Sequence, residues 1–124
     1  MKQRHRAQQI WQILSAVAEF KTKGEVGEPG LITYGELAKR MGYSSQAGRT
    51  LAVPLGMLAR YCESQELPSL NAIVVNLTGE PGSGVIFDPA VGLDKDQQAV
   101  LEEKWFLLRT PKAKAIRKAA RWLG

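Results

Sequence analysis

The feature that most constrains the fold of this chain is a helix start within residues 31–43. Thr33 and Glu36 have the Thr-x-x-Glu spacing of a capping box. In such a box the threonine hydroxyl accepts a hydrogen bond from the amide three residues later, and the glutamate carboxylate accepts one from the threonine amide. Leu37 and Met41 then lie one turn apart on a single helix face. The sequence therefore predicts a short amphipathic helix that starts after Thr33.

A second helix is expected directly after the first. Gly42 can adopt the left-handed conformation that ends a helix, and the next helical pattern starts near Ser44 or Ser45 and runs through Arg60 or beyond. Pro54 removes one hydrogen bond inside this pattern, so we expect a break or bend there. Two helices joined this tightly usually meet at a steep angle, which leaves the second free to enter a DNA groove. The pattern predicts a helix-turn-helix, and the alternative is a helical hairpin without a ligand.

The distribution of charge says more than the net charge of +5. Residues 1–23 carry five cations against one acid, and residues 109–124 carry six cations and no acid. Residues 24–108 carry six cations against eleven acids, but residues 33–60 within them carry four cations against Glu36 alone. Basic clusters of this kind are typical of phosphate binding. The alternative is that basic ends only keep the protein in solution.

Further elements are expected on both sides of this pair. Apolar residues at helical spacing predict a helix over residues 7–22, and three glycines and a proline predict a loop over residues 23–30. A β-branched run predicts a strand over residues 71–76. A loop rich in turn residues, 78–84, leads to a return strand over residues 85–87. A hairpin that directly follows a helix-turn-helix is a wing.

Two C-terminal helices complete the expected fold. Asp94 and Gln97 have the spacing of a second capping box. The apolar side of the helix they start is expected to carry Leu101, Trp105 and Leu108, flanked by Val100 and Leu107. Thr110 suits the N-cap and Pro111 the first turn of the last helix. One face of that helix is expected to carry Ile116, Ala120 and Leu123.

The chain is long enough for one compact domain and too short for two domains of ordinary size. We predict an α+β, mostly helical fold: a single winged helix-turn-helix domain over residues 1–124 with flanking helices. Residues 7–22 form the N-terminal helix, residues 31–87 the helix-turn-helix and its wing, and residues 94–124 the two C-terminal helices.

Three segments resemble a family of DNA-repair proteins. Ile32–Ala38, Arg49–Ala52 and Val74–Gly79 are similar to parts of the C-terminal domain of the O6-alkylguanine-DNA alkyltransferases and the alkyltransferase-like proteins. These parts are the first helix of the helix-turn-helix, the recognition helix, and the strand with its wing. The resemblance covers roughly residues 30–84, under half of the chain, and it implies a winged-helix fold.

The same resemblance implies that Tyr34 and Arg49 act on DNA, the arginine by filling the stack left by a flipped nucleotide. This chain departs from the family at the active site. Residues 70–73 (Leu-Asn-Ala-Ile) occupy the four positions of the family's Pro-Cys-His-Arg, so the nucleophile position holds Asn71. We therefore expect no alkyl transfer, and we carry over the fold and a DNA-contacting face but not lesion recognition.

No catalytic residue, cofactor or metal site is expected. The one cysteine, Cys62, falls on the apolar side of the second helix, which favours a buried structural role and rules out an internal disulfide. That side also carries Leu51, Leu55 and Leu58. His5, the one histidine, precedes the first expected helix. Asp88, Asp94 and Asp96 could hold a divalent metal only if folding brought them together, so a nuclease is the enzyme alternative.

The expected function is non-enzymatic binding of double-stranded DNA in the cytoplasm. No apolar run is long enough to span a membrane or to serve as a signal peptide, and we expect no small-molecule substrate. Groove contacts would come from Ser45, Gln46 and Arg49. Contacts to the DNA backbone would come from Tyr34, Lys39 and Arg40. The basic last helix would add phosphate contacts through Lys112, Lys114, Arg117, Lys118 and Arg121.

The alternative function is a protein-interaction module, such as a small regulator or an accessory factor in a nucleic-acid complex. Winged helices often bind proteins, and a fold does not by itself decide a function. The expected wing, residues 77–84, contains Glu80 and no cation, which favours this alternative. The basic charge of residues 33–60 favours DNA.

Overall fold

The structure, a computed structural model, describes residues 2–76 and 87–123, and these residues are mostly helical. The α-helices are α1 (Gln3–Phe20), α2 (Tyr34–Arg40), α3 (Ala52–Ser64), α4 (Lys95–Glu102) and α5 (Ala113–Leu123). Short 3₁₀ helices form η1 (Ser45–Leu51), η2 (Leu70–Ile73) and η3 (Trp105–Leu107), and the strands are β1 (Ile32–Thr33) and β2 (Val74–Val75). The mostly helical α+β prediction is confirmed. Within the described ranges, no helix is long and apolar enough to cross a membrane.

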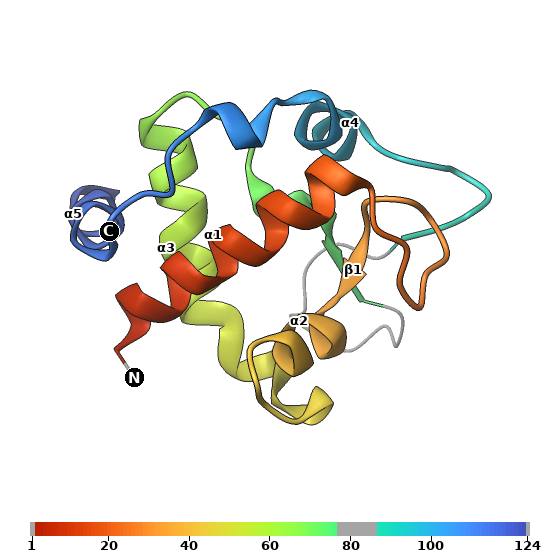
Figure 1. The fold of residues 1–124 in the computed structure, drawn as a ribbon, viewed down its shortest axis with the longest axis horizontal. Helices are drawn as coiled ribbons and strands as arrows, with labels where there is room; N and C mark the ends of the chain where they lie inside the picture. Colours follow the sequence, from red (N-terminus) through yellow and green to blue (C-terminus); the bar gives the residue numbers. More distant parts are fainter. Residues whose placement is uncertain (1, 77–86, 124) are drawn as a thin grey trace.

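Helix α1 crosses the middle of the molecule and carries much of the core (Figure 1). Its buried side carries six residues at helical spacing: Ala7, Ile10, Trp11, Leu14, Val17 and Ala18. The ring of Trp11 meets two other rings edge-on, Trp105 at 5.4 Å and Tyr61 at 5.9 Å between centroids. The helix begins before the predicted residue 7, so it includes His5, and it ends at Phe20 because Lys21 has a left-handed φ of 50°.

The two strands form a parallel pair in which Ile32 is opposite Val74 and Thr33 is opposite Val75. The predicted strand over residues 71–76 is wrong in its first half, because residues 70–73 form η2. The side-chain amide of Asn71 donates to the carbonyl of Leu55 at 2.9 Å, which ties η2 to α3. The predicted wing loop and residues 85–86 of the return strand lie outside the described residues, and Phe87 is buried but not in a strand.

Helix α3 differs from prediction in where it breaks. The helical path changes from 3₁₀ to α at Leu51–Ala52, so Pro54 lies in the first α-helical turn rather than at a mid-helix kink. A first-turn amide has no partner inside its helix, so a proline there loses no hydrogen bond. The predicted apolar side is confirmed, because its four residues are buried: Leu51, Leu55, Leu58 and Cys62.

The C-terminal third is less regular than predicted. The capping box of α4 is confirmed, but the helix ends at Glu102 instead of continuing to Leu108. The indole of Trp105 donates to the carbonyl of Val100 at 2.7 Å and packs against Trp11. These contacts hold the residues after α4 against α1 instead of letting them continue the helix. Leu107 is left exposed.

The last helix also begins later than predicted. The amides of Ala115 and Ile116 both bond to the carbonyl of Lys112, so Lys112 takes the N-cap position expected for Thr110. The carbonyl of Pro111 is used elsewhere, since it accepts a hydrogen bond from the Gln8 side chain at 3.1 Å. The residue just before the N-cap of α5 is therefore tied to α1 by this hydrogen bond.

Candidate nucleic-acid interface

The start of α2 has the geometry that the sequence predicts. The amide of Glu36 donates to the Thr33 hydroxyl, and the amide of Thr33 donates to the Glu36 carboxylate, both at 3.1 Å. The same hydroxyl donates to Glu25 Oε1 at 3.1 Å, which ties the preceding loop to the helix start. Gly42 follows α2 with a φ of +94°, which confirms the predicted left-handed helix end. The capping box fixes the position from which α2 leaves the sheet.

Helix α2 and η1 pack closely because two glycines lie at their contact. A β-carbon at Gly35 would lie 3.2 Å from the carbonyl oxygen of Ser45. A β-carbon at Gly48 would lie 3.0 Å from the β-carbon of Tyr34. Sequence reasoning missed this role for both glycines. The available signal was a glycine inside each of two stretches that otherwise have a helical pattern.

The predicted groove residues lie together on η1. The hydroxyl of Ser44 accepts from the amide of Gln46 at 3.2 Å and caps this segment. Ser45, Gln46 and Arg49 are all exposed, while Gly48 and Leu51 of the same segment are buried. The segment therefore has one face in the core and one face of hydrogen-bonding side chains on the surface.

The predicted backbone-contact residues lie on α2. Lys39 and Arg40 are exposed in its last turn, where cations are favourable to the helix dipole. Tyr34 is half-buried in the first turn. Burial raises the pKa of its phenol above the ordinary value of 10.0, so the hydroxyl stays protonated and able to donate a hydrogen bond.

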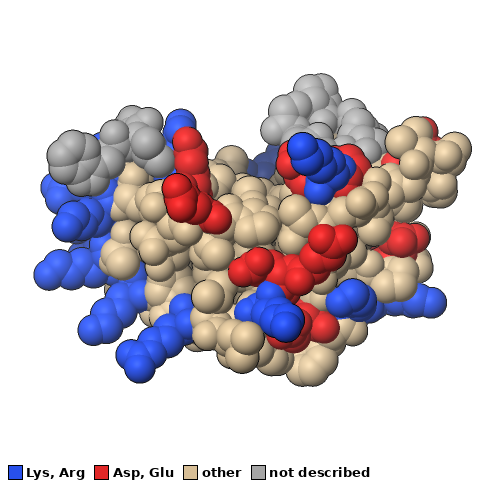
Figure 2. All heavy atoms as spheres, turned by 90° about the horizontal axis from the view of Figure 1, so that it is seen from above, with Lys and Arg blue, Asp and Glu red and all other residues tan. Residues whose placement is uncertain are grey.

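The predicted cations of α5 are all exposed: Lys112, Lys114, Arg117, Lys118 and Arg121. The other side of α5 buries Ala113 and Ile116 against α3 and α1. In Figure 2 lysine and arginine side chains form a fringe along the left edge, the side on which α5 lies in Figure 1. Four of them line a shallow hollow of about 410 Å³. This surface has no competing acid on α5, because that helix contains none.

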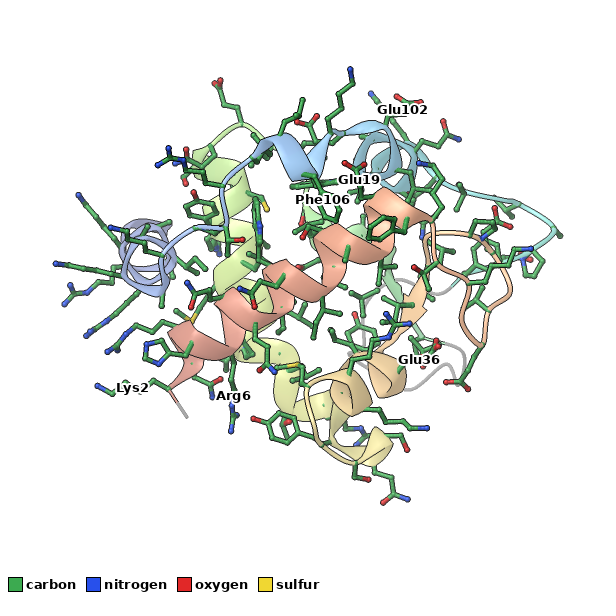
Figure 3. The ribbon with its side chains drawn as sticks, in the orientation of Figure 1. Lys2, Arg6, Glu19, Glu36, Glu102 and Phe106 are labelled. Carbon is green, nitrogen blue, oxygen red and sulfur yellow. The ribbon has the colours of Figure 1, made fainter. Side chains whose placement is uncertain are left out.

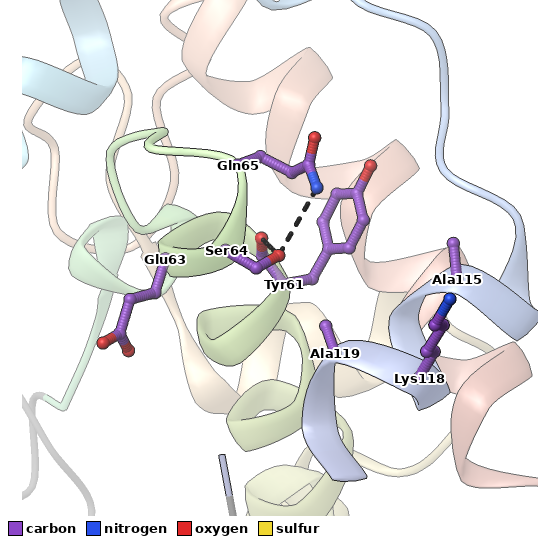
Figure 4. A pocket seen from close by; sticks show the side chains of 7 residues that line it. All are labelled: Tyr61, Glu63, Ser64, Gln65, Ala115, Lys118 and Ala119. Atoms are coloured by element: carbon purple, nitrogen blue, oxygen red, sulfur yellow. Dashed lines mark hydrogen bonds between the residues drawn. The ribbon is translucent and has the colours of Figure 1, made fainter. Parts of the chain in front are cut away.

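A groove of about 560 Å³ separates α5 from the end of α3 (Figure 4). It is lined by Tyr61, Glu63, Ser64, Gln65, Ala115, Lys118 and Ala119. Burial, with a smaller effect of the neighbouring Cys62, raises the pKa of the Tyr61 phenol. The groove therefore offers neutral polar groups with one acid and one cation, in contrast to the purely cationic outer side of α5.

Sequence reasoning also missed the place of the first turns of α1. The guanidinium of Arg6 lies 5.3 Å from the centre of the Tyr43 ring, in the segment between α2 and η1. Figure 3 shows Arg6 extending from α1 toward this segment. The hydrogen bond from Gln8 to Pro111 connects the next turn to the start of α5. The basic charge of residues 1–23 was the signal, but it did not show which elements they meet.

The candidates for enzyme chemistry are not brought together. Cys62 is buried, and burial raises the pKa of its thiol although a backbone hydrogen bond with Leu70 lowers it in part. His5 lies on α1 and is exposed. Across residues 2–76 and 87–123, no group of three His, Cys, Asp or Glu side chains is placed to hold a metal ion.

Comparisons with protein-family models, with curated proteins and with solved structures find no match to this chain.

Proposed function

We propose that this protein binds double-stranded DNA without enzymatic activity, through a winged helix-turn-helix whose helix-turn-helix is formed by α2, η1 and the start of α3. The observation that carries the proposal is the exposed face of η1 with Ser45, Gln46 and Arg49, on a segment that packs against α2, whose last turn carries the exposed Lys39 and Arg40. Amide, hydroxyl and guanidinium groups at the start of a second helix are the groups that read base edges in the major groove. The glycine contact between α2 and η1 holds these groups on a rigid base.

The cations of α5 add to this binding through phosphate contacts. They lie outside the core on a helix whose apolar side is already buried, so they are free to face a polyanion. Each phosphate contact contributes affinity without sequence preference and makes binding weaken as salt rises. On this proposal η1 supplies the sequence- or shape-dependent part of binding, and α5 supplies the salt-dependent part.

Kinship with the alkyltransferase-like proteins belongs to the same proposal. The position that would hold the nucleophile is Asn71, whose side-chain amide donates to the carbonyl of Leu55. An amide used in this way supports a structural role there. We propose a DNA-contacting relative of these proteins that has lost the reaction.

Fluorescence anisotropy tests the proposal, with a random-sequence duplex and the matching single strand at salt from about 50 to 200 mM. We expect duplex binding of about micromolar affinity that weakens steeply with salt. Arg49→Ala should weaken it by about tenfold, because a base or phosphate contact is lost. Lys104→Ala, which removes an exposed cation just before η3, is the matched control and should change little. Absence of duplex binding at the lowest salt would contradict the proposal.

A protein-interaction module is the second candidate function, and a patch of exposed apolar side chains favours it. Phe20 is 70% exposed, Phe106 54% and Leu107 79%, and the two phenylalanine rings stack edge-on at 5.2 Å. Exposed aromatic clusters often mark sites of protein contact. The end of α1 and η3, which carry these side chains, lie on the same side of the molecule as α4 and away from α2 (Figure 1). Arg49→Glu separates the two functions, because it should abolish DNA binding and leave capture of a protein partner intact.

A further inference from the structure

The first turn of α1 carries charge that works against its own helix. Lys2 is the N-cap residue and its side chain makes no capping hydrogen bond, and the first turn contains no acid. Arg4 and His5 follow within that turn, and Arg6 directly after. The N-terminus of a helix is the positive end of its dipole, so cations there destabilise the helix where acids would stabilise it. The fully buried side of α1 begins only at Ala7, so Lys2 and Arg4 are not part of the core.

The position of this turn connects the two parts of the proposed DNA surface. The guanidinium of Arg6 lies over the ring of Tyr43, in the segment that connects α2 to η1, so its positive charge lies beside this segment. Gln8 bonds to the carbonyl of Pro111, one residue before the N-cap of α5. Figure 1 shows the start of α1 between α2 at the bottom and α5 at the left. The first turns of α1, which carry these cations, therefore lie between α2 and α5.

We propose that Lys2, Arg4 and Arg6 form a third contact to the phosphate backbone of duplex DNA, so that η1, the start of α1 and α5 bind one continuous stretch of the duplex. The inference rests on the proposed function. It explains why the chain keeps destabilising charge at this helix end, because residues chosen for binding commonly lower stability. The long side chains of lysine and arginine reach phosphates without close approach of the backbone.

Arg6 has a different role in this contact from the other two. Its guanidinium lies over the Tyr43 ring, which limits its rotamers before DNA arrives. Lys2 is exposed and Arg4 half-exposed. Arg6 thus supplies a positioned contact, and Lys2 and Arg4 supply mobile charge.

The test is a double variant, Lys2→Ser with Arg4→Glu, which gives α1 a capping side chain and an acid in its first turn. We expect two opposite effects on one protein. The melting temperature should rise by roughly 3 °C, because the cap and the acid both favour the helix. Affinity for the duplex at low salt should fall by about tenfold, and the slope of log affinity against log salt should decrease by about 2.

The matched control is Lys23→Ser with Lys104→Glu, which makes the same change in charge at exposed positions away from this surface. It should leave duplex affinity within about twofold of the wild type, since screening by salt limits distant charges. If the wild type binds duplex, Arg49→Ala weakens it, and the α1 variant behaves like the control, this inference is wrong and the proposed function stands. A fall in melting temperature in the α1 variant would also overturn it, since these cations would then support the fold. If the wild type does not bind duplex at all, the proposed function and this inference are both wrong.

Discussion

The two ends of α1 are both charged against the helix dipole, but their surroundings differ. At the last turn Glu19 is an acid where a cation would be favourable, and its carboxylate accepts a hydrogen bond from the amide of Phe106 at 3.3 Å. Lys21, just beyond, donates to the carbonyl of Leu101 at 3.3 Å. At the first turn neither Lys2 nor Arg4 has a comparable contact among the described residues. The unfavourable charge at the last turn makes a hydrogen bond within the fold, whereas the charge at the first turn remains available to solvent or a ligand.

The parts of the molecule around the two ends of α1 also differ in how they are stabilised. Around the last turn lies an aromatic region, in which η3 buries Trp105 and leaves Phe106 and Leu107 exposed. Figure 3 labels Glu19 and Phe106 in this region. Around the first turn lies a basic region, in which α2 and η1 are held together by backbone contact at two glycines. The contacts of the aromatic region are made by large buried side chains, whereas the contact between α2 and η1 depends on two positions that have no side chain. The two regions should therefore fail in different ways when they are mutated.

The largest effect is expected at Trp105 in the aromatic region. Trp105→Ala removes a side chain that is 1% exposed, its ring contact with Trp11, and the partner of the Val100 carbonyl. The free energy of unfolding should fall by about 3–5 kcal/mol, measured by urea denaturation. Phe106→Ala, one residue later and largely exposed, is the control and should cost under about 1 kcal/mol. Equal losses in the two variants would mean that the region does not depend on the buried ring.

A smaller loss is expected at Gly48 in the basic region. Gly48→Val forces side-chain atoms against Tyr34, so α2 and η1 must separate, and the free energy of unfolding should fall by about 1–3 kcal/mol. Duplex affinity should fall too, because the exposed face of η1 moves. Gly56→Ala is the matched control, since a β-carbon there meets nothing within 4 Å and alanine favours the α-helix by about 1 kcal/mol. A destabilised Gly56 variant would show that the close contact is not the cause.

The smallest effects compare the two capping boxes, one in each region. Thr33→Ala and Asp94→Ala should each lower the free energy of unfolding by about 1 kcal/mol. Thr33→Ala should lower the free energy of unfolding more than Asp94→Ala does. Thr33 is buried and also donates a hydrogen bond to Glu25, whereas Asp94 is exposed. Thermal unfolding of the two single variants under one set of conditions measures the difference. A larger loss for Asp94→Ala would mean that the aromatic region depends more on its helix cap than the basic region does.

The parts of the fold that sequence reasoning predicted are those that depend on neighbouring residues. Both capping boxes and the left-handed Gly42 are decided within a few residues, and all three were predicted correctly. The end of α4 was missed because Trp105 turns back to pack on Trp11, a contact made across 94 positions of sequence. The extent and partner of β2 were missed for the same reason, since β-strand pairing is not local.

The candidate site shows the same division. Ser45, Gln46 and Arg49 were expected at the start of the second helix, and all three are exposed on η1, while their contact with DNA stays a prediction. The approach of the start of α1 to Tyr43 was not, because no local pattern reports which helix lies beside a turn. The basic composition of the N-terminus could be read from the sequence, but its place in the surface needed the fold.

Thr33 has a consequence for how the molecule folds. It is the last residue of β1 and the N-cap of α2, so the register of the strand also determines where the helix starts. A slip of one residue would turn the hydroxyl to the opposite face of the strand and away from the amide of Glu36. A parallel pair of two residues per strand is too short to persist alone. It forms only when Val75, 42 positions later, reaches Thr33, so we expect α2 and η1 to take their final places late in folding, after the core has closed.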